Sequence, residues 1–233
     1  VLAGAIASIT GFGIGSVLTP AFGLSVPTNV AVAAVSLPHL VGTALRFWLL
    51  RAQVDRRVLL SFGLTSAAGG LTGALLQRWA GSPALTVLFG GLLMFTGVGE
   101  LTGLSRRMRF RGPTAWLAGA LSGVLGGLVG NQGGIRSAAL LGFDVRKEAF
   151  VASATAVGLI VDGARMPVYL VTERHEVIAI GGLVILATAG LVVGTLLGRV
   201  TLARIPERRF RGLVAVLLLL LGTAMAAKGL VAL

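Results

Sequence analysis

The sequence predicts an all-α integral membrane protein made of two inverted-topology repeats, each a broken, re-entrant helix pair followed by three transmembrane helices. Of its 233 residues, 55% are hydrophobic, a larger share than in a typical soluble domain. Its mean hydropathy is +0.94. Apolar stretches of about 20 residues, the length that crosses a bilayer, recur along the whole chain. The second half of the sequence also repeats the order of features in the first half.

This repetition predicts an internal duplication, with copies at residues 1–112 and 113–233 of one membrane domain. The matching features occur in the same order with small gaps: residues 2–5 match 117–120, Ser36 matches Thr155, Arg46 matches Arg165, Gly69 and Gly73 match Gly190 and Gly194, and Pro83 matches Pro206. The two copies are therefore expected to share one fold.

Each copy is predicted to contain four helical elements. They are residues 1–24, 28–50, 57–79 and 83–104 in the first copy, and 114–143, 147–171, 176–199 and 208–231 in the second. The third element of each copy carries a Gly-x-x-x-Gly spacing, which lets helix backbones approach closely in lipid. We interpret these glycines as packing residues.

The first element of each copy contains a glycine-rich break. Residues 11–15 (Gly-Phe-Gly-Ile-Gly) and residues 126–134, which hold five glycines, are poor helix interiors. A half-helix of about 10 residues spans about 15 Å, half the hydrocarbon thickness. Each first element is therefore expected to enter the membrane to its centre and return to the same side.

Basic residues set the expected orientation. With re-entrant first elements, 14 of the 20 Lys and Arg residues lie in loops on one side, as the positive-inside rule requires. These inner residues are Arg51, Arg56, Arg57, Arg106, Arg107, Arg109, Arg111, Arg146, Lys147, Arg199, Arg204, Arg208, Arg209 and Arg211. Each copy then crosses three times, so the copies are inverted. The net charge of +12 does not indicate nucleic-acid binding, because the arginines occupy short loops rather than a soluble basic face.

Broken helices that meet at mid-depth between inverted repeats are typical of secondary transporters. The positive ends of the second half-helices favour an anion. The candidate substrate-binding residues are Gly13, Gly15, Ser16, Arg46, Asn131, Gln132, Gly133, Gly134, Arg136 and Arg165.

Arg136 is the sharpest candidate because it follows the second glycine break, deep in the membrane. An arginine at the centre of a membrane helix costs about 3 kcal/mol, so intramembrane charges indicate function. The alternative is a structural ion pair with Asp162.

Further ionisable residues lie on the second elements. Arg46 and Arg165 occupy equivalent places in the two copies, and either could instead extend its head group to the membrane surface. Asp162 precedes Arg165 by three residues, a spacing that favours a salt bridge over a proton-carrying role. His39 is either a titrating group or a hydrogen-bonded core histidine. Asp162 and His39 are the candidates for coupling or gating.

The glycine-rich openings, residues 11–20 and 130–137, and the alanine-rich helix starts at residues 33–36 and 152–155 resemble those of the sulfite exporter TauE/SafE family, also called the toluene sulfonate uptake permease family. The resemblance covers the whole chain. It implies a carrier for small sulfur oxyanions or organosulfonates in a bacterial plasma membrane.

The predicted function is therefore secondary transport of a small anion, sulfite or an organosulfonate, by alternating access at a central basic site. An anion channel on the same scaffold is the alternative. An enzyme is not expected, because the sequence has no His-Glu-x-x-His, Gly-x-Ser-x-Gly or Walker A pattern and no cysteine. The expected partners are the anion and the lipid bilayer, with no cofactor, metal or nucleic acid. Coupling to protons or sodium and assembly as a homo-oligomer stay open.

Overall fold

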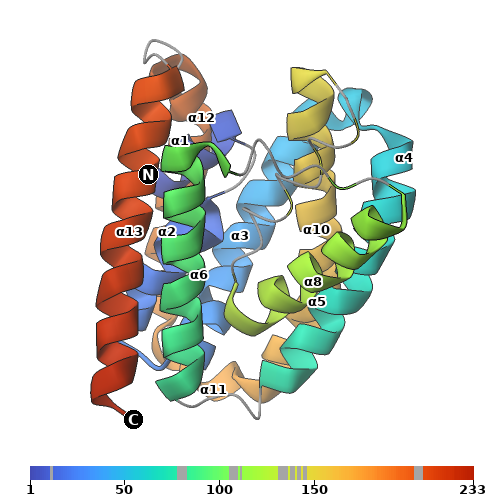
Figure 1. The fold of residues 1–233 in the computed structure, drawn as a ribbon. Helices are drawn as coiled ribbons and strands as arrows, with labels where there is room; N and C mark the ends of the chain where they lie inside the picture. Colours follow the sequence, from blue (N-terminus) through green and yellow to red (C-terminus); the bar gives the residue numbers. More distant parts are fainter. Residues whose placement is uncertain are drawn as a thin grey trace.

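The structure, a computed structural model, describes residues 1–10, 13–77, 83–104, 110, 112–130, 136, 140, 143, 146–201 and 207–233. Within these residues the regular structure is entirely helical (Figure 1). Six of the described helices are long and apolar enough to cross a membrane: Thr28–Gln53, Arg56–Gln77, Pro83–Thr102, Glu148–Thr172, Gly181–Gly198 and Gly212–Val231. They fall three in each half of the chain, which agrees with the predicted number of crossings.

The helix boundaries follow the predicted elements closely. In the first half the helices are α1 (Leu2–Thr10), α2 (Ile14–Gly23), α3 (Thr28–Leu50), α4 (Arg56–Val58), a π-helical turn (Leu59–Gly63), α5 (Leu64–Gln77) and α6 (Pro83–Thr102). In the second half they are α8 (Pro113–Val129), α10 (Lys147–Thr172), α11 (Arg174–Ala179), α12 (Gly181–Thr201) and α13 (Glu207–Val231). The predicted element 176–199 differs, because α11 and α12 divide it.

Both first elements are interrupted at their glycines. The first is split into α1 and α2, and Gly13 has a φ of 111° just before α2 begins. In the second, α8 ends where Gly130 adopts a φ of 70°, and the Gly130 N–H donates to the Gly126 carbonyl. A residue with a side chain would be strained in either conformation. Beyond Gly130, only single positions of the predicted returning half are among the described residues.

Each half packs its first element against the third element of the other half. Helix α1 lies on α12, and α8 lies on α5. Helices α3 and α10 pack together at the centre, and α6 packs on α13 at the edge (Figure 1). A Cβ atom on Gly4 would overlap the Leu191 carbonyl, and one on Gly69 would overlap the Ala120 carbonyl. The prediction that the third-element glycine Gly69 serves close packing is confirmed.

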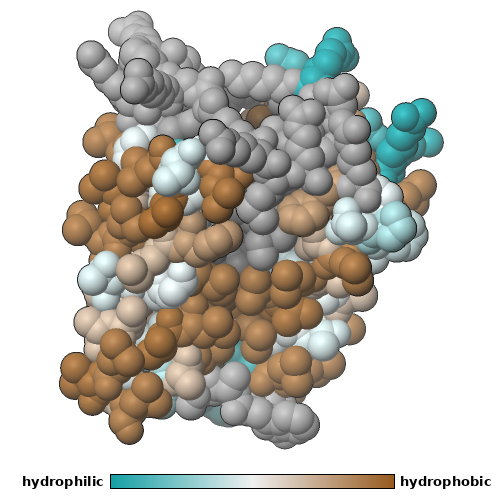
Figure 2. Space-filling view, viewed as in Figure 1, coloured by the Kyte–Doolittle hydropathy of each residue, from teal (hydrophilic) through white to brown (hydrophobic). Residues whose placement is uncertain are grey.

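The outer surface is apolar, as a bilayer requires. Large hydrophobic side chains on the membrane-length helices are exposed, including Leu186 at 70% and Leu220 at 65%. In the coloured part of Figure 2, hydrophobic residues cover most of the surface, and the most hydrophilic ones gather at the upper right, near α4. Such continuous exposure of leucine and valine is unfavourable in water but suits hydrocarbon.

Candidate functional site

The two glycine breaks meet at the centre of the protein. A Cβ atom on Gly15, in the first turn of α2, would overlap the carbonyl oxygen of Gly130 at the end of α8. A Cβ on Gly130 would lie 3.0 Å from the Thr19 Oγ1 atom. Ser16 is 4% exposed and sits in this same first turn of α2. The positive end of α2 is therefore buried directly against the terminus of α8.

Arg46 on α3 and Arg165 on α10 hold the inner ends of the broken elements. Their side chains are 4% and 2% exposed, so neither head group extends to the surface. The Nη1 atom of Arg46 donates to the carbonyl of Ala7, and the Nη1 atom of Arg165 donates to the carbonyl of Gly126. Both carbonyls belong to the last turns of α1 and α8, where a helix dipole favours a cation.

Asp162 neutralises Arg165. Its Oδ1 atom accepts hydrogen bonds from Arg165 Nη2 at 2.9 Å and from Nε at 3.1 Å. Its Oδ2 atom lies 2.6 Å from His39 Nδ1, and the Thr43 hydroxyl lies 3.2 Å from the same nitrogen. The predicted salt bridge of Asp162 and Arg165 is confirmed, and His39 is a hydrogen-bonded core histidine that joins α3 to α10.

Arg136 has no such compensation. Its side chain is 2% exposed, and its Nε and Nη1 atoms have no hydrogen-bond partner among the described residues. The guanidinium lies against Gly158 of α10, where a Cβ atom would be only 3.1 Å from Nη1. The alternative pairing with Asp162 is not seen among the described residues, where that carboxylate pairs with Arg165 and His39.

The described centre therefore carries an excess of positive charge. Three buried arginines, Arg46, Arg136 and Arg165, are matched there by one buried carboxylate, Asp162. Glu173, the other buried carboxyl of the described residues, lies at the α11 end and binds Asn29. The Nε atom of Arg46 also lacks a hydrogen-bond partner within the described part of the chain. A buried charge without a counter-charge costs several kcal/mol, so these nitrogens form a site that an anion would stabilise.

Two contributors were not identified from the sequence. Tyr169 is 2% exposed, and its hydroxyl donates to the carbonyl of Gly127 in the last turn of α8. Its guanidinium neighbour Arg165 lies 5.9 Å from the ring centre. Tyr169 is the single tyrosine of the chain, which is the one signal that could have indicated it. Thr43 becomes visible only through its contact with His39.

Four predicted site residues, Asn131, Gln132, Gly133 and Gly134, lie outside the described residues. Within the described ranges, no group of three or more His, Asp or Glu side chains could hold a metal ion. The site's chemistry, as far as it is described, is that of cationic and neutral hydrogen-bond donors.

At the end of α3 and α10 nearest α11, Asn29 donates to Glu173 at 2.9 Å. Burial, with the nearby charge of Glu176, raises the pKa of the Glu173 carboxyl. At the same end of the molecule, the Lys228 ammonium donates to the carbonyl of Gly23 at 2.6 Å and so caps the C-terminal end of α2. Both ends of α2 are thus fixed by contacts with other helices.

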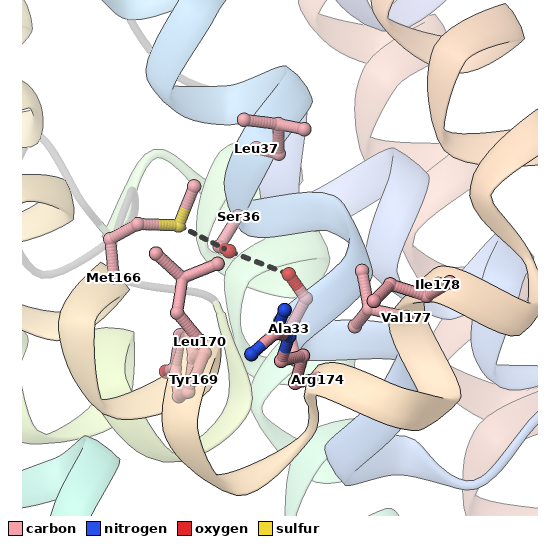
Figure 3. Close-up of a pocket in the computed structure, with 9 residues that line it drawn as sticks. All are labelled: Ala33, Ser36, Leu37, Met166, Tyr169, Leu170, Arg174, Val177 and Ile178. Atoms are coloured by element: carbon pink, nitrogen blue, oxygen red, sulfur yellow. Dashed lines mark hydrogen bonds between the residues drawn. The ribbon is translucent and has the colours of Figure 1, made fainter.

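A cavity of about 360 Å³ opens between α3, α10 and α11. It is lined by Ala33, Ser36, Leu37, Met166, Tyr169, Leu170, Arg174, Val177 and Ile178 (Figure 3). Its walls are largely apolar, and Arg174 is its charged residue.

Comparison with known protein families gives one result. The model of the family described as "Sulfite exporter TauE/SafE" matches residues 1–225, nearly the whole chain, so the protein belongs to this family. No curated protein and no solved structure matches the chain. The resemblance seen in the sequence is confirmed, and the chain is a multi-pass membrane transporter of sulfur anions, not an enzyme.

Proposed function

We propose that this TauE/SafE family member is a secondary transporter that carries sulfite, an organosulfonate or a related sulfur oxyanion by alternating access. The anion binds between the two broken elements, beside Arg136 and Arg46. The observation that carries this proposal is the group of buried guanidinium nitrogens on these two arginines that have no hydrogen-bond partner in the part of the chain that the structure describes. An oxyanion supplies both the acceptor atoms and the negative charge that these nitrogens lack.

The proposed site combines charge with backbone. The first turn of α2 directs its N–H groups towards the region where α8 ends, and such helix starts favour anions. Gly13, Gly15 and Ser16 belong to this turn or precede it, and we assign them to substrate binding together with residues 131–134. Arg165 is assigned a positioning role, because its charge is compensated by Asp162.

Alternating access would arise from two inverted repeats, residues 1–112 and 113–233, that move against each other. The first element of each repeat packs on the third element of the other repeat, α1 on α12 and α8 on α5, which supports this arrangement. So does the antiparallel contact of α3 with α10, in which Asn29 meets Glu173 at one end and the Asp55 N–H meets Ser153 at the other. Each repeat contributes one broken element to the site.

His39 and Asp162 are proposed to couple or gate transport. They join α3 to α10 beside the arginines, so protonation of this pair would change the charge of the site and the contact between the repeats together. Sodium coupling and homo-oligomer formation stay predictions of the sequence.

The proposed setting is a bacterial plasma membrane, with the arginines of α4 and the start of α10 inside. Arg51, Arg56 and Arg57 lie at the end of α3 opposite α11, and Arg146 precedes α10 at that same end. Such an asymmetry of basic residues is the usual orientation signal.

The test is uptake of radiolabelled sulfite into proteoliposomes, with counterflow as the second readout. A carrier exchanges external label for internal unlabelled sulfite, whereas a channel would give single-channel currents without counterflow. Loss of a charged hydrogen-bond donor to the bound anion should cost about 2 kcal/mol of its binding free energy. Arg136→Ala should therefore slow uptake at low sulfite concentration about thirtyfold. Arg56→Ala, at an exposed surface position, is the matched control and should transport normally.

If sulfite and a panel of organosulfonates enter no faster than into empty liposomes, the proposal is wrong.

A further inference from the structure

The cavity beside α11 lies between α3 and α10, the two helices that also carry Arg46 and Arg165 of the candidate anion site. Ser36 on α3 and Met166 on α10 line its inner part (Figure 3). The Ser36 hydroxyl lies 3.1 Å from the Met166 sulfur and also donates to the Ala33 carbonyl at 2.5 Å. The side chains of these two residues therefore meet across the groove between α3 and α10.

Beyond this contact, the facing residues of α3 and α10 form further layers of contacts, about one helical turn apart. Since the helices are antiparallel, one turn further along α3 corresponds to one turn back along α10. The next layer is the His39–Asp162 pair. The layer after it holds Gly158, which contacts the guanidinium of Arg136. The Ser36–Met166 contact thus separates the cavity from the arginine site by about two helical turns.

We propose that this cavity is the vestibule of the transport path on the α11 face, and that the Ser36–Met166 contact is its closed gate. The proposal rests on the proposed function, because a path needs a transported anion.

The chemistry of the gate suits opening and closing. A methionine side chain is unbranched and changes rotamer easily, and a thioether sulfur is a weak acceptor. Ser36 keeps its bond to Ala33 when the sulfur moves away. The gate can therefore open without leaving a buried hydroxyl unpaired.

The charged residue that lines the cavity is a cation, which suits an anion, and the exposed carboxyl Glu176 of α11 is not among the lining residues. Arg174 points into the cavity (Figure 3) and forms no ion pair among the described residues. The adjacent carboxyl of Glu173 is only 7% exposed and is bound to Asn29, so it is withdrawn from the mouth. Arg174 would attract an anion from solution before it reaches the gate.

The test uses cysteine accessibility, for which this chain is well suited because it has no cysteine of its own. Met166→Cys and the near-isosteric Ser36→Cys are each treated with an anionic, membrane-impermeant iodoacetamide, which forms a thioether that sulfite does not cleave, added separately to each side of oriented membranes. Labelling is read by mass, and sulfite uptake is measured in parallel. Ile185→Cys on the lipid-exposed face of α12, with Ile185 71% exposed, is the matched control.

The expected result is labelling of Met166→Cys from the α11 side at least about tenfold faster than of Ile185→Cys, because a thiolate forms in an aqueous cavity but not in hydrocarbon. Labelling should block sulfite uptake measured after the reagent is washed away, and an excess of sulfoacetate, an organosulfonate that does not react with the reagent, should slow labelling. Ser36→Cys should react from the same side.

Three outcomes overturn the inference while wild-type uptake stays intact. They are failure of both cysteines to react, reaction from the opposite side alone, and labelling that leaves uptake unchanged, which would indicate a lipid-facing pocket. If wild-type protein moves no anion at all, the proposed function fails first and the inference fails with it.

Discussion

Helices α3 and α10 occupy equivalent places in the two halves, and each presents an arginine to the last turn of a broken element. Arg46 donates to Ala7, and Arg165 donates to Gly126. Three residues before the arginine, however, α10 carries Asp162 where α3 carries Thr43. One arginine is consequently neutralised within its own half, whereas the other is not. The shared residues build the scaffold, and the residue that differs leaves the positive charge available.

Removing the neutralising carboxylate should have the largest effect. Asp162→Asn leaves Arg165 buried without a counter-charge, and breaking a buried ion pair costs about 3 to 5 kcal/mol. Thermal unfolding in detergent should show a strongly destabilised or unfolded protein. Glu176→Gln, at an exposed carboxyl, should unfold like wild type. A stable Asp162→Asn protein would contradict the role of Asp162 as the structural counter-ion.

Giving α3 the same carboxylate should abolish the difference between the halves. In Thr43→Asp, the new carboxylate stands near Arg46 and Arg136 and competes with the transported anion. Sulfite uptake should fall about tenfold or more, while the unfolding temperature stays equal or rises. Thr43→Val, which keeps the shape but adds no charge, should lose much less activity. Equal losses in both variants would show that the hydroxyl of Thr43, not the local charge, matters.

Crowding Arg136 should have a moderate effect. A Cβ atom at position 158 would come within 3.1 Å of Arg136 Nη1, so Gly158→Ala should raise the half-saturating sulfite concentration several-fold. Gly163 on the same helix has nothing within 4 Å of its ideal Cβ position. Gly163→Ala should therefore keep normal uptake kinetics and gain about 0.5 to 1 kcal/mol of stability. Identical kinetics in the two variants would argue against the assigned place of Arg136.

The smallest effect is expected where α3 and α10 meet near α11. Because the folded pKa of Glu173 is raised, its contribution to stability is fully present below the ordinary carboxyl pKa of about 4.3 and declines as pH rises through the folded value. The unfolding temperature of the wild-type protein should decrease slightly as the pH rises from the ordinary carboxyl pKa to the raised pKa of Glu173 in the folded protein. Glu173→Gln should flatten that part of the profile, and an unchanged slope would contradict the assignment.

The helix positions could be predicted from the sequence because lipid imposes a minimum apolar length and glycines interrupt it. Element 28–50 coincides with α3, and the break at Gly13 lies where the glycines indicated. The pairing of helices between the halves could not be predicted, since a lipid-facing helix is apolar all round and its buried face leaves no clear pattern. The π turn at Leu59–Gly63 likewise has no sequence signature.

The charged centre was predictable in composition but not in connectivity. An arginine after a glycine break and an Asp–Arg spacing of three residues indicate a basic site and a salt bridge. The contact of His39 with Asp162 joins the two halves of the chain, and the bond of Tyr169 to Gly127 joins residues more than forty positions apart. Both contacts depend on the fold itself.

The exchange of first elements between the halves also constrains how the protein is made. Helix α1 is synthesised before α12, against which Gly4 packs, and the helices from α2 to α11 lie between them in the chain. Until α12 is made, α1 lacks the helix on which it packs. The short apolar helix α1 thus reaches its final place only after α12 has been made, and neither half is expected to assemble into a stable unit without the other.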